Sequence, residues 1–270
     1  MVAEQGLLHS FVSVDGVVPR LQRCAGNPCL LQSFDAPPTG APDAGAAITQ
    51  CQSWPEVRED EPVVGVRCYS AGGQLIQCCG HGLLAAAHRW QRRLQRSVLN
   101  VSMNGSLVAS WREGDVTWLR FASMRTVGHS VPVWLEQVFG KAPPQAAATA
   151  GNEQGYLVVQ WPDGVDLAHL PRPGDILAEY TERALICTSA HPEWGEGVIQ
   201  LRYFAPQYGV DEDAATGSAM RVLAQYWSPR FHELTAYQCS PSGGLLLSRH
   251  AKAHVDVGGR CVIDTAGAHD

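Results

Sequence analysis

The feature that most constrains the fold of this chain is an internal repeat, offset by about half of its 270 residues. The segment 66–90 (VRCYSAGGQLIQCCGHGLLAAAHRW) aligns with the segment 201–227 (LRYFAPQYGVDEDAATGSAMRVLAQYW). Each runs from an Arg-bearing strand pattern through a turn and a glycine into an apolar helix pattern that ends on tryptophan. Because such self-similarity indicates repeated structural units, we expect two similar domains, at residues 1–126 and 127–270.

Strand patterns outnumber helix patterns along the chain. Helices are expected at 44–53, 81–95, 131–140 and 217–228, and loops at the Pro/Ala-rich segments 35–47 and 141–152. Alternating or β-branched runs indicate strands at 7–14, 61–70, 105–112, 115–122, 155–161, 175–189, 197–205, 233–240, 243–248 and 251–263. Strands and helices do not alternate regularly, as a doubly wound sheet would require, so the expected class is α+β.

Composition excludes several classes of partner. A formal net charge of −6 and a pI near 5.9 argue against binding to nucleic acid or an anionic membrane, which needs clustered Lys and Arg. The sequence shows neither a long apolar run nor a signal-peptide pattern at its start, so a cytoplasmic location is expected. The nine cysteines are odd in number and lack framework spacing, which predicts reduced thiols placed mostly in the core.

Each repeat places reactive or polar residues at the start of its helix. The first turn of a helix has up to four free backbone N–H groups, which attract an anion such as a carboxylate. Two such helix ends, facing each other across a cleft, would hold a small acid. Cys79 and His81 flank the first end, and Asp213, Thr216 and Ser218 flank the second. A simpler interpretation is that Thr216 or Ser218 is an N-cap and His81 a buried polar residue with satisfied hydrogen bonds.

Three motifs carry a resemblance to a known family. LRYFAPQYGVDEDAATGSAM (201–220) resembles the second signature of the PhzF-like isomerases of phenazine biosynthesis, and CCGHGLLAAAH (78–88) resembles their first. AGNPCLL (25–31) is similar to the Gly-Asn-Pro element near the family's N-terminus. The resemblance implies the diaminopimelate-epimerase-like fold: two pseudo-symmetric domains, each a curved sheet or open barrel around a central helix, with the active site between them. It also implies a homodimer.

The chemistry that this resemblance implies is isomerisation or epimerisation of a small carboxylic acid by proton transfer at carbon, without a cofactor. Asp213 matches a carboxylate that handles the proton, His81 and Ser218 match residues lining the pocket, and Cys79 matches a catalytic thiol of the related epimerases. A structural role for Cys79 is an equal alternative. We expect Gly80 and Gly217 to let the backbone approach the substrate carboxylate, next to Thr216.

A metal site is not expected. Cys78, Cys79, His81 and His88 could be drawn around one zinc ion, but adjacent cysteines do not easily share a tetrahedral ion. The two histidines would also lie two helical turns apart on the predicted helix.

The sequence departs from the family pattern ahead of the first helix. PhzF-like isomerases carry a catalytic Glu about 28 residues before their Gly-His pair, and this chain has Gln52 there. The nearest carboxylates are Glu56 and Glu59; Glu56 could substitute from a shifted backbone, although a solvated loop acid is the simpler interpretation. Two alternatives therefore stay open: a non-catalytic binder of a small acid that kept the fold and lost this Glu, and a lyase that uses the same proton abstraction.

Overall fold

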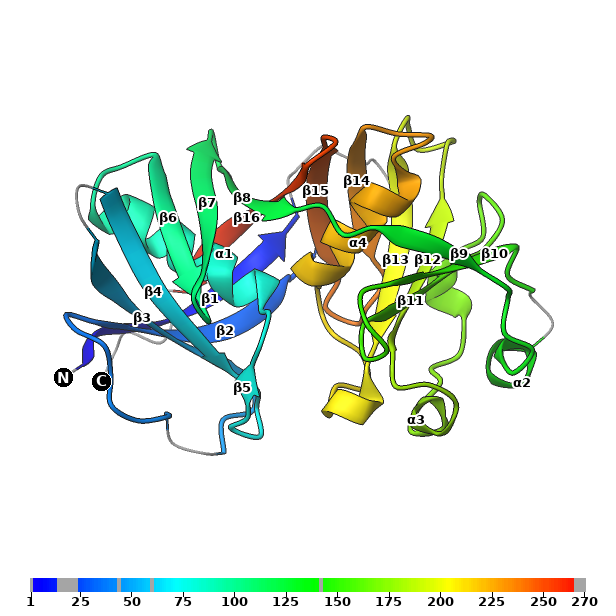
Figure 1. Ribbon diagram of the computed structural model, residues 1–270, viewed down its shortest axis with the longest axis horizontal. Coiled ribbons are helices and arrows are strands. Elements are labelled where there is room, and N and C mark those ends of the chain that lie inside the picture. Colours follow the sequence, from blue (N-terminus) through cyan, green and yellow to red (C-terminus); the bar gives the residue numbers. More distant parts are fainter. Residues whose placement is uncertain (1, 14–23, 43–44, 59–60, 141–142, 265–270) are drawn as a thin grey trace.

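The protein consists of two sheet-based halves, each built around one helix (Figure 1). The computed structural model describes residues 2–13, 24–42, 45–58, 61–140 and 143–264. The central helices are α1 (Gly80–Arg93) in the first half and α4 (Gly217–Trp227) in the second. The helices predicted at 81–95 and 217–228 are thus confirmed almost to the residue, since both have a long apolar pattern that begins after a glycine.

The first half is a closed barrel around α1. Its closure follows from β1, which pairs with β2 on one side and with the last strand, β16, on the other. The short strand β5 (Leu75–Ile76) pairs with β4 outside the closed path. In order around the barrel, the strands are β1 (Val2–Val12), β2 (Asn27–Phe34), β3 (Thr49–Arg58), β4 (Glu61–Tyr69), β6 (Val98–Met103), β7 (Ser106–Glu113), β8 (Val116–Ala122) and β16 (His254–Asp264).

The second half continues the same sheet from β16 and covers α4. Two short helices, α2 (Leu135–Phe139) and α3 (Ile176–Tyr180), and the 3₁₀ turns Leu167–His169 and Pro206–Tyr208 lie outside this sheet. From β16 outward the strands are β15 (Gly244–His250), β14 (Glu233–Gln238), β13 (Val198–Phe204), β12 (Ala184–Ala190), β11 (Tyr156–Gln160), β10 (Ala146–Ala150) and β9 (Thr126–His129).

The pairing pattern repeats between the halves. β2–β3 is parallel, β3–β4 antiparallel and β4–β6 parallel; β11–β12, β12–β13 and β13–β14 follow the same sequence of directions. The repeated tryptophans also have the same role. Trp90 donates its ring N–H to the Ser53 hydroxyl at 3.0 Å, and Trp227 donates to the Thr188 hydroxyl at 3.1 Å. The predicted pseudo-symmetric α+β fold is therefore confirmed.

β16 belongs to both halves, because it pairs with β1 and β8 in the barrel and with β15 in the second sheet. The division at residues 1–126 and 127–270 stays a prediction, and β16 is the strand at which the two halves join. Within the described ranges, the helices are all too short or too polar to cross a membrane.

Some local predictions are wrong. The helix expected at 44–53 is replaced by β3 from Thr49 onward, because this segment fits between β2 and β4. The strand expected at 175–189 begins only at Ala184, after the short helix α3. Part of the loop expected at 141–152 is strand β10, whose alanines are held by pairing on both sides. In each case non-local pairing overrides local propensity.

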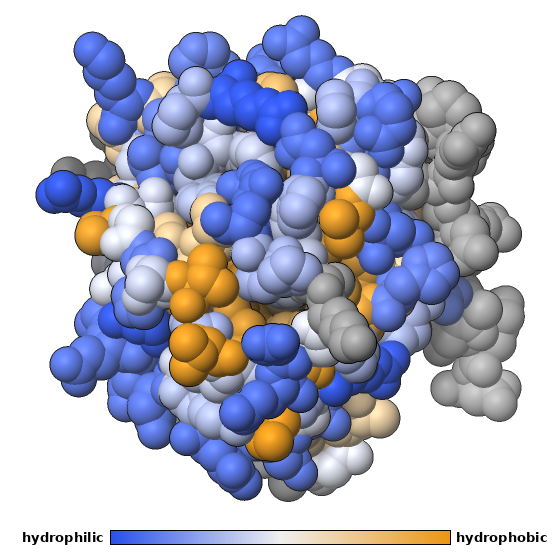
Figure 2. All heavy atoms as spheres, turned by 90° about the vertical axis from the view of Figure 1, so that its right-hand side faces the viewer, coloured by the Kyte–Doolittle hydropathy of each residue, from blue (hydrophilic) through white to orange (hydrophobic). Residues whose placement is uncertain are grey.

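The outer end of the second half is mostly polar. Figure 2 shows hydrophilic side chains over most of this face, with apolar side chains in small groups. Exposed apolar residues of this half include Val127, Val133 and Ile176. The homodimer implied by the resemblance stays a prediction.

Candidate active site

The N-termini of α1 and α4 meet at the junction of the two halves. A Cβ atom built on Gly80 would lie 2.8 Å from the Cα of Gly217 and 3.2 Å from the backbone nitrogen of Ser218. A Cβ on Gly217 would lie 3.1 Å from the Cα of Gly80 and 3.2 Å from the ring of Phe11. Both glycines are buried, so their missing side chains are what allows this approach.

Neither helix end is capped by its own N-cap side chain. Cys79 and Thr216 occupy the N-cap positions in extended conformation, and neither makes a side-chain capping bond. The first intrahelical bonds are donated by Leu83 to Cys79 and by Met220 to Thr216. The N–H groups of residues 80–82 and 217–219 precede these bonds, so both helix ends present donors to an anion.

Cys79 and His81 are paired at the first helix end. The Cys79 sulfur lies 3.7 Å from Nδ1 and 3.9 Å from Nε2 of His81. Both residues are buried, and the Ser10 hydroxyl donates to the His81 carbonyl at 2.9 Å. The sequence predicted these two residues at this end, and the structure brings their side chains together.

This pair is polarised toward thiolate and imidazolium. Hydrogen bonds from the Cys51 and Cys68 thiols, together with the charge of His81, hold the pKa of Cys79 well below its usual value although burial opposes this. Burial lowers the pKa of His81, but the Cys79 charge, the hydrogen bond with Cys79 and the Asp213 charge outweigh it and raise the pKa to about 10. The site thus holds a negative sulfur beside a positive ring.

Asp213 is held in one orientation at the second helix end. Its Oδ1 accepts from the side-chain amide of Asn27 at 2.8 Å and from the Ala214 N–H at 3.0 Å. Its Oδ2 accepts the Thr216 hydroxyl at 2.6 Å. The hydroxyl of Thr216 therefore orients Asp213 instead of capping α4, which departs from the simple N-cap interpretation.

Two buried amides that no sequence motif marked as site residues, those of Asn27 and Gln238, support this arrangement. Asn27 also donates to the Ala215 carbonyl at 2.8 Å. Gln238, from β14, donates to the Asp213 carbonyl at 2.7 Å and accepts from the Thr216 N–H at 2.8 Å. Asn27 lies in the Gly-Asn-Pro element, which gave a signal for it, whereas no local pattern points to Gln238.

The two acids that precede Asp213, Asp211 and Glu212, differ in environment. Glu212 is buried and accepts two hydrogen bonds from Arg202, at 2.7 and 3.0 Å, and Arg172 approaches it to 2.9 Å. Asp211 is exposed. Because Glu212 is paired with Arg202, we assign it a structural role. Asp213 is the acid that lies beside the helix ends.

Ser218 lies in the first turn of α4 and hydrogen bonds with Tyr156 of β11. The tyrosine is partly buried, and this burial raises its pKa. The predicted binding residue Ser218 thus sits beside a neutral phenol, which adds a hydroxyl near the second helix end.

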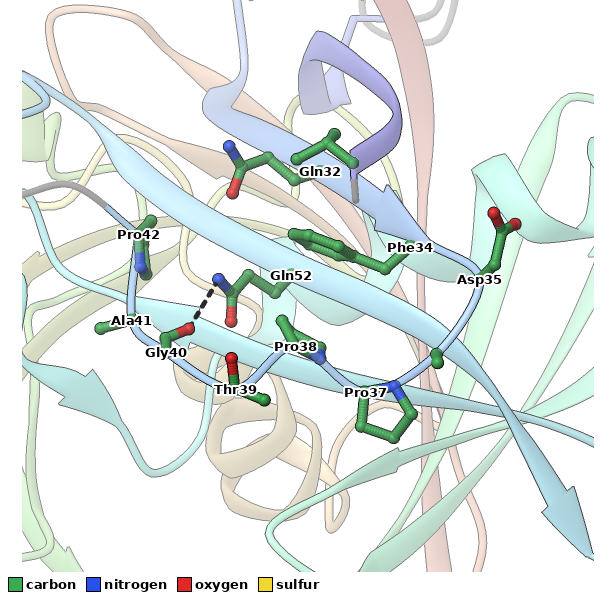
Figure 3. Close-up of a pocket in the computed structure, with 12 residues that line it drawn as sticks. Gln32, Phe34, Asp35, Pro37, Pro38, Thr39, Gly40, Ala41, Pro42 and Gln52 are labelled. Carbon is green, nitrogen blue, oxygen red and sulfur yellow. Dashed lines mark hydrogen bonds between the residues drawn. The ribbon is translucent and has the colours of Figure 1, made fainter.

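The structure does not bring Gln52 or Glu56 to the helix ends. Gln52 donates its amide to the Gly40 carbonyl under the segment 35–42, in a cavity of about 510 Å³ (Figure 3). Glu56 lies four residues further along β3, on the same face as Gln52 and opposite to Cys51. Its distance from Cys51 along the strand is about 16 Å, at roughly 3.3 Å per residue. Cys51, in contrast, faces α1.

Three thiols form the one group among the described residues with metal-ligand proximity. The sulfurs of Cys51, Cys68 and Cys79 lie within 4.8 Å of one another. The Cys51 and Cys68 sulfurs are only 2.9 Å apart, whereas thiolates on one soft ion with bonds of about 2.3 Å lie about 3.8–4.0 Å apart. The expectation of no metal stays a prediction, and of the four residues considered for zinc only Cys79 belongs to this cluster. His88 instead contacts the Thr117 hydroxyl at 3.2 Å.

Comparison with known proteins adds family relationships to this geometry. The model of the family "phenazine biosynthesis-like protein" matches residues 56–267. An "uncharacterized isomerase" of Pseudomonas aeruginosa is 32% identical over 205 residues, which cover 71% of this chain and 72% of that protein. Mouse phenazine biosynthesis-like domain-containing protein 1 is 32% identical over 213 residues, covering 71% of this chain and 73% of its own.

Solved structures show the same fold. A PhzF-family protein of Enterococcus faecalis matches with a TM-score of 0.75 at 20% identity, covering 97% of this chain and 96% of its own. A probable proline racemase of Agrobacterium radiobacter, crystallised with bound carbonate, matches with a TM-score of 0.56 at 9% identity, covering 96% of this chain and 90% of its own. The expected diaminopimelate-epimerase-like architecture is confirmed by these likenesses.

Proposed function

Because the chain belongs to the phenazine biosynthesis-like protein family, we propose that it is an isomerase or epimerase that moves a proton at carbon of a small carboxylic acid, without a cofactor. The observation that carries this proposal is the convergence of two uncapped helix N-termini, with Cys79 and His81 at one and Asp213 at the other. One relative from P. aeruginosa and one from Vibrio cholerae are named uncharacterized isomerases, and one structural neighbour is named a probable proline racemase.

In the proposed reaction, the backbone N–H groups of the two helix ends hold the substrate carboxylate and stabilise charge that develops beside it. Asp213 removes the proton, since its carboxylate is already oriented by Asn27 and Thr216. His81, kept charged by the Cys79 thiolate, returns a proton at the other side. The buried environment strengthens these interactions because it excludes water.

Deuterium exchange tests the proposal. The protein is incubated in D₂O with a panel of small 2-amino, 2-hydroxy and β,γ-unsaturated acids, and NMR follows loss of carbon-bound hydrogen. We expect exchange in the wild type and its loss in Asp213→Asn. Asp211→Asn is the matched control, because it makes the same charge change on an exposed residue two positions away and should exchange normally.

A second function is favoured by one specific observation: no carboxylate of the first half's described residues replaces the family's Glu at the helix ends, since Gln52 and Glu56 lie elsewhere. The alternative is a non-catalytic protein that binds a small acid. Calorimetric binding that survives Asp213→Asn, combined with the absence of wild-type exchange for every acid that binds, would establish this alternative and exclude the enzyme.

A further inference from the structure

Three thiols from different elements converge under the first turn of α1, and the proposed reaction uses only one of them. Cys51 comes from β3, Cys68 from β4, and Cys79 is the N-cap of α1. A Cβ atom on Gly82 would lie 2.5 Å from the sulfurs of both Cys51 and Cys68, and 2.9 Å from that of Cys79. The glycine therefore provides the space that the three sulfurs share.

Cys51 and Cys68 have the geometry of a pair that can be oxidised. They are direct partners in the antiparallel β3–β4 ladder, and their sulfurs are 2.9 Å apart. Such partners have Cα atoms about 4.5–5.5 Å apart, within the range of about 4.4–6.8 Å found for disulfides. The two sulfurs need to close by about 0.9 Å to reach the bond length of roughly 2.05 Å. A shared metal would instead require them to separate.

The three cysteines differ in their access to solvent. Cys51 and Cys68 have no exposed surface, whereas Cys79 is 3% exposed and stands beside His81 at the helix ends. A small oxidant that enters between the halves therefore meets Cys79 first. The thiolate, and not the thiol, is the nucleophile that attacks such an oxidant.

We propose that the three cysteines form a thiol relay, in which Cys79 is a modification site for small peroxides and passes the oxidation to the buried pair Cys51–Cys68. In the first step, the Cys79 thiolate attacks one oxygen of hydrogen peroxide. The O–O bond breaks and hydroxide leaves, which takes a proton from His81 to become water. Cys79 is then a sulfenic acid.

Two exchanges complete the relay. The Cys51 thiol attacks the Cys79 sulfur, a second water leaves, and a Cys51–Cys79 disulfide forms. The Cys68 thiol then attacks the Cys51 sulfur, which it already contacts, and expels Cys79 as thiolate while its proton returns to His81. In total, one peroxide and two thiols give one disulfide and two waters. The relay restores Cys79 and keeps it from irreversible oxidation to sulfinic acid.

The test treats the fully reduced protein with one equivalent of hydrogen peroxide, alkylates the remaining thiols and maps the peptides by mass spectrometry. We expect a Cys51–Cys68 disulfide together with alkylated Cys79. In Cys68→Ala the reaction should stop at Cys51–Cys79, and in the double variant Cys51→Ala/Cys68→Ala the sulfinic form of Cys79 should accumulate. Cys187→Ala, which removes a buried thiol of the other half, is the control and should react as the wild type does.

Cys79→Ser separates the relay from direct oxidation of the pair. The rate of Cys51–Cys68 disulfide formation should fall more than about tenfold, because the inner thiols lack a thiolate that meets the oxidant. An unchanged rate in Cys79→Ser would overturn the proposal, as would a wild type oxidised only at the exposed Cys78. Thermal melting of each variant checks folding. No isomerase substrate is used, so this result is independent of the proposed function.

Discussion

Gly80 and Gly217 are in direct backbone contact, so the two central helices begin at one point of the molecule. A Cβ atom on Gly80 would lie 2.8 Å from the Cα of Gly217. The obstructing atoms are backbone, which cannot swing aside as the end of a long side chain can. This contact sets how closely the two halves approach.

Replacing Gly80 by alanine should therefore destabilise the protein. We expect the free energy of unfolding to fall by about 1–3 kcal/mol, as for other overpacked sites. Urea denaturation measures this change. Gly128→Ala is the control, because a Cβ there meets nothing within 4 Å and should change the free energy by less than about 0.5 kcal/mol. Equal stability of the two variants would contradict the close contact.

Asn27→Ala should weaken both the fold and the site. The change leaves the Asp213 carboxylate and the Ala215 carbonyl without their amide donor, at a cost of about 1–3 kcal/mol in unfolding free energy. Deuterium exchange at the substrate carbon should also slow, because Asp213 loses one of the groups that orient its carboxylate. Gln32→Ala, on the same strand but with an exposed amide, should leave stability and exchange almost unchanged; a loss of equal size there would point to a general effect on β2.

The Cys79–His81 pair predicts how stability falls at alkaline pH. The pKa of His81 is raised from 6.5 to about 10, so its contribution is complete below pH 6.5 and is lost as the pH rises through about 10. The pKa of Cys79 is lowered from 9.0, so its contribution is complete above pH 9.0 and is lost as the pH falls through the lowered value. From pH 9.0 upward the loss from His81 outweighs what remains of the rise from Cys79.

The measurement compares the wild type with Cys79→Ser/His81→Gln, so that other titrating groups cancel. Their difference in unfolding free energy should shrink between pH 9.0 and pH 10 by about 0.7 kcal/mol, half of the 1.4 kcal/mol per pH unit for one full proton, because native His81 and unfolded Cys79 are each partly titrated in this interval. Chemical denaturation at closely spaced pH values measures this change. A difference that stays constant across this interval would show that the pair is not charged in the native state.

Glu212→Gln should be strongly destabilising although it keeps the shape of the side chain. Glu212 and Arg202 are each almost fully buried, so the variant leaves the Arg202 charge without its partner. Breaking such a pair costs about 3–5 kcal/mol. The exposed pair of Asp115 and Arg260 offers the control: Asp115→Asn should cost no more than about 1 kcal/mol. Similar values for the two variants would mean that Arg202 finds another partner.

Local sequence patterns correctly predicted the elements whose hydrophobic periodicity matches their burial in the fold. The apolar patterns after Gly80 and Gly217 gave α1 and α4, and the repeat gave the pairing of the helix ends. The same reasoning failed for residues 49–53, where helix-compatible residues lie between β2 and β4. Whether such a segment forms a helix or a strand depends on its pairing with strands that are distant in sequence. Local patterns in a single sequence do not reveal this pairing.

The candidate site was predictable where its residues belong to one motif. Cys79, His81, Asp213 and Thr216 stand at the two helix starts, and the structure places them there. Gln238 was not predictable, because it reaches the site only through the parallel pairing of β14 with β13. The same holds for the thiol cluster, which depends on the β3–β4 register that sets Cys51 opposite Cys68.

The position of β16 has a consequence for how the protein is made. The barrel closes when Leu7 and its neighbours pair with residues near Asp264, contacts that join opposite ends of the described chain. A nascent chain leaves the ribosome with β1 first and β16 last, so the first barrel remains without its closing strand until translation has passed the whole second half. Contacts of such long sequence separation also slow folding. The half that is synthesised first is thus the half that is completed last.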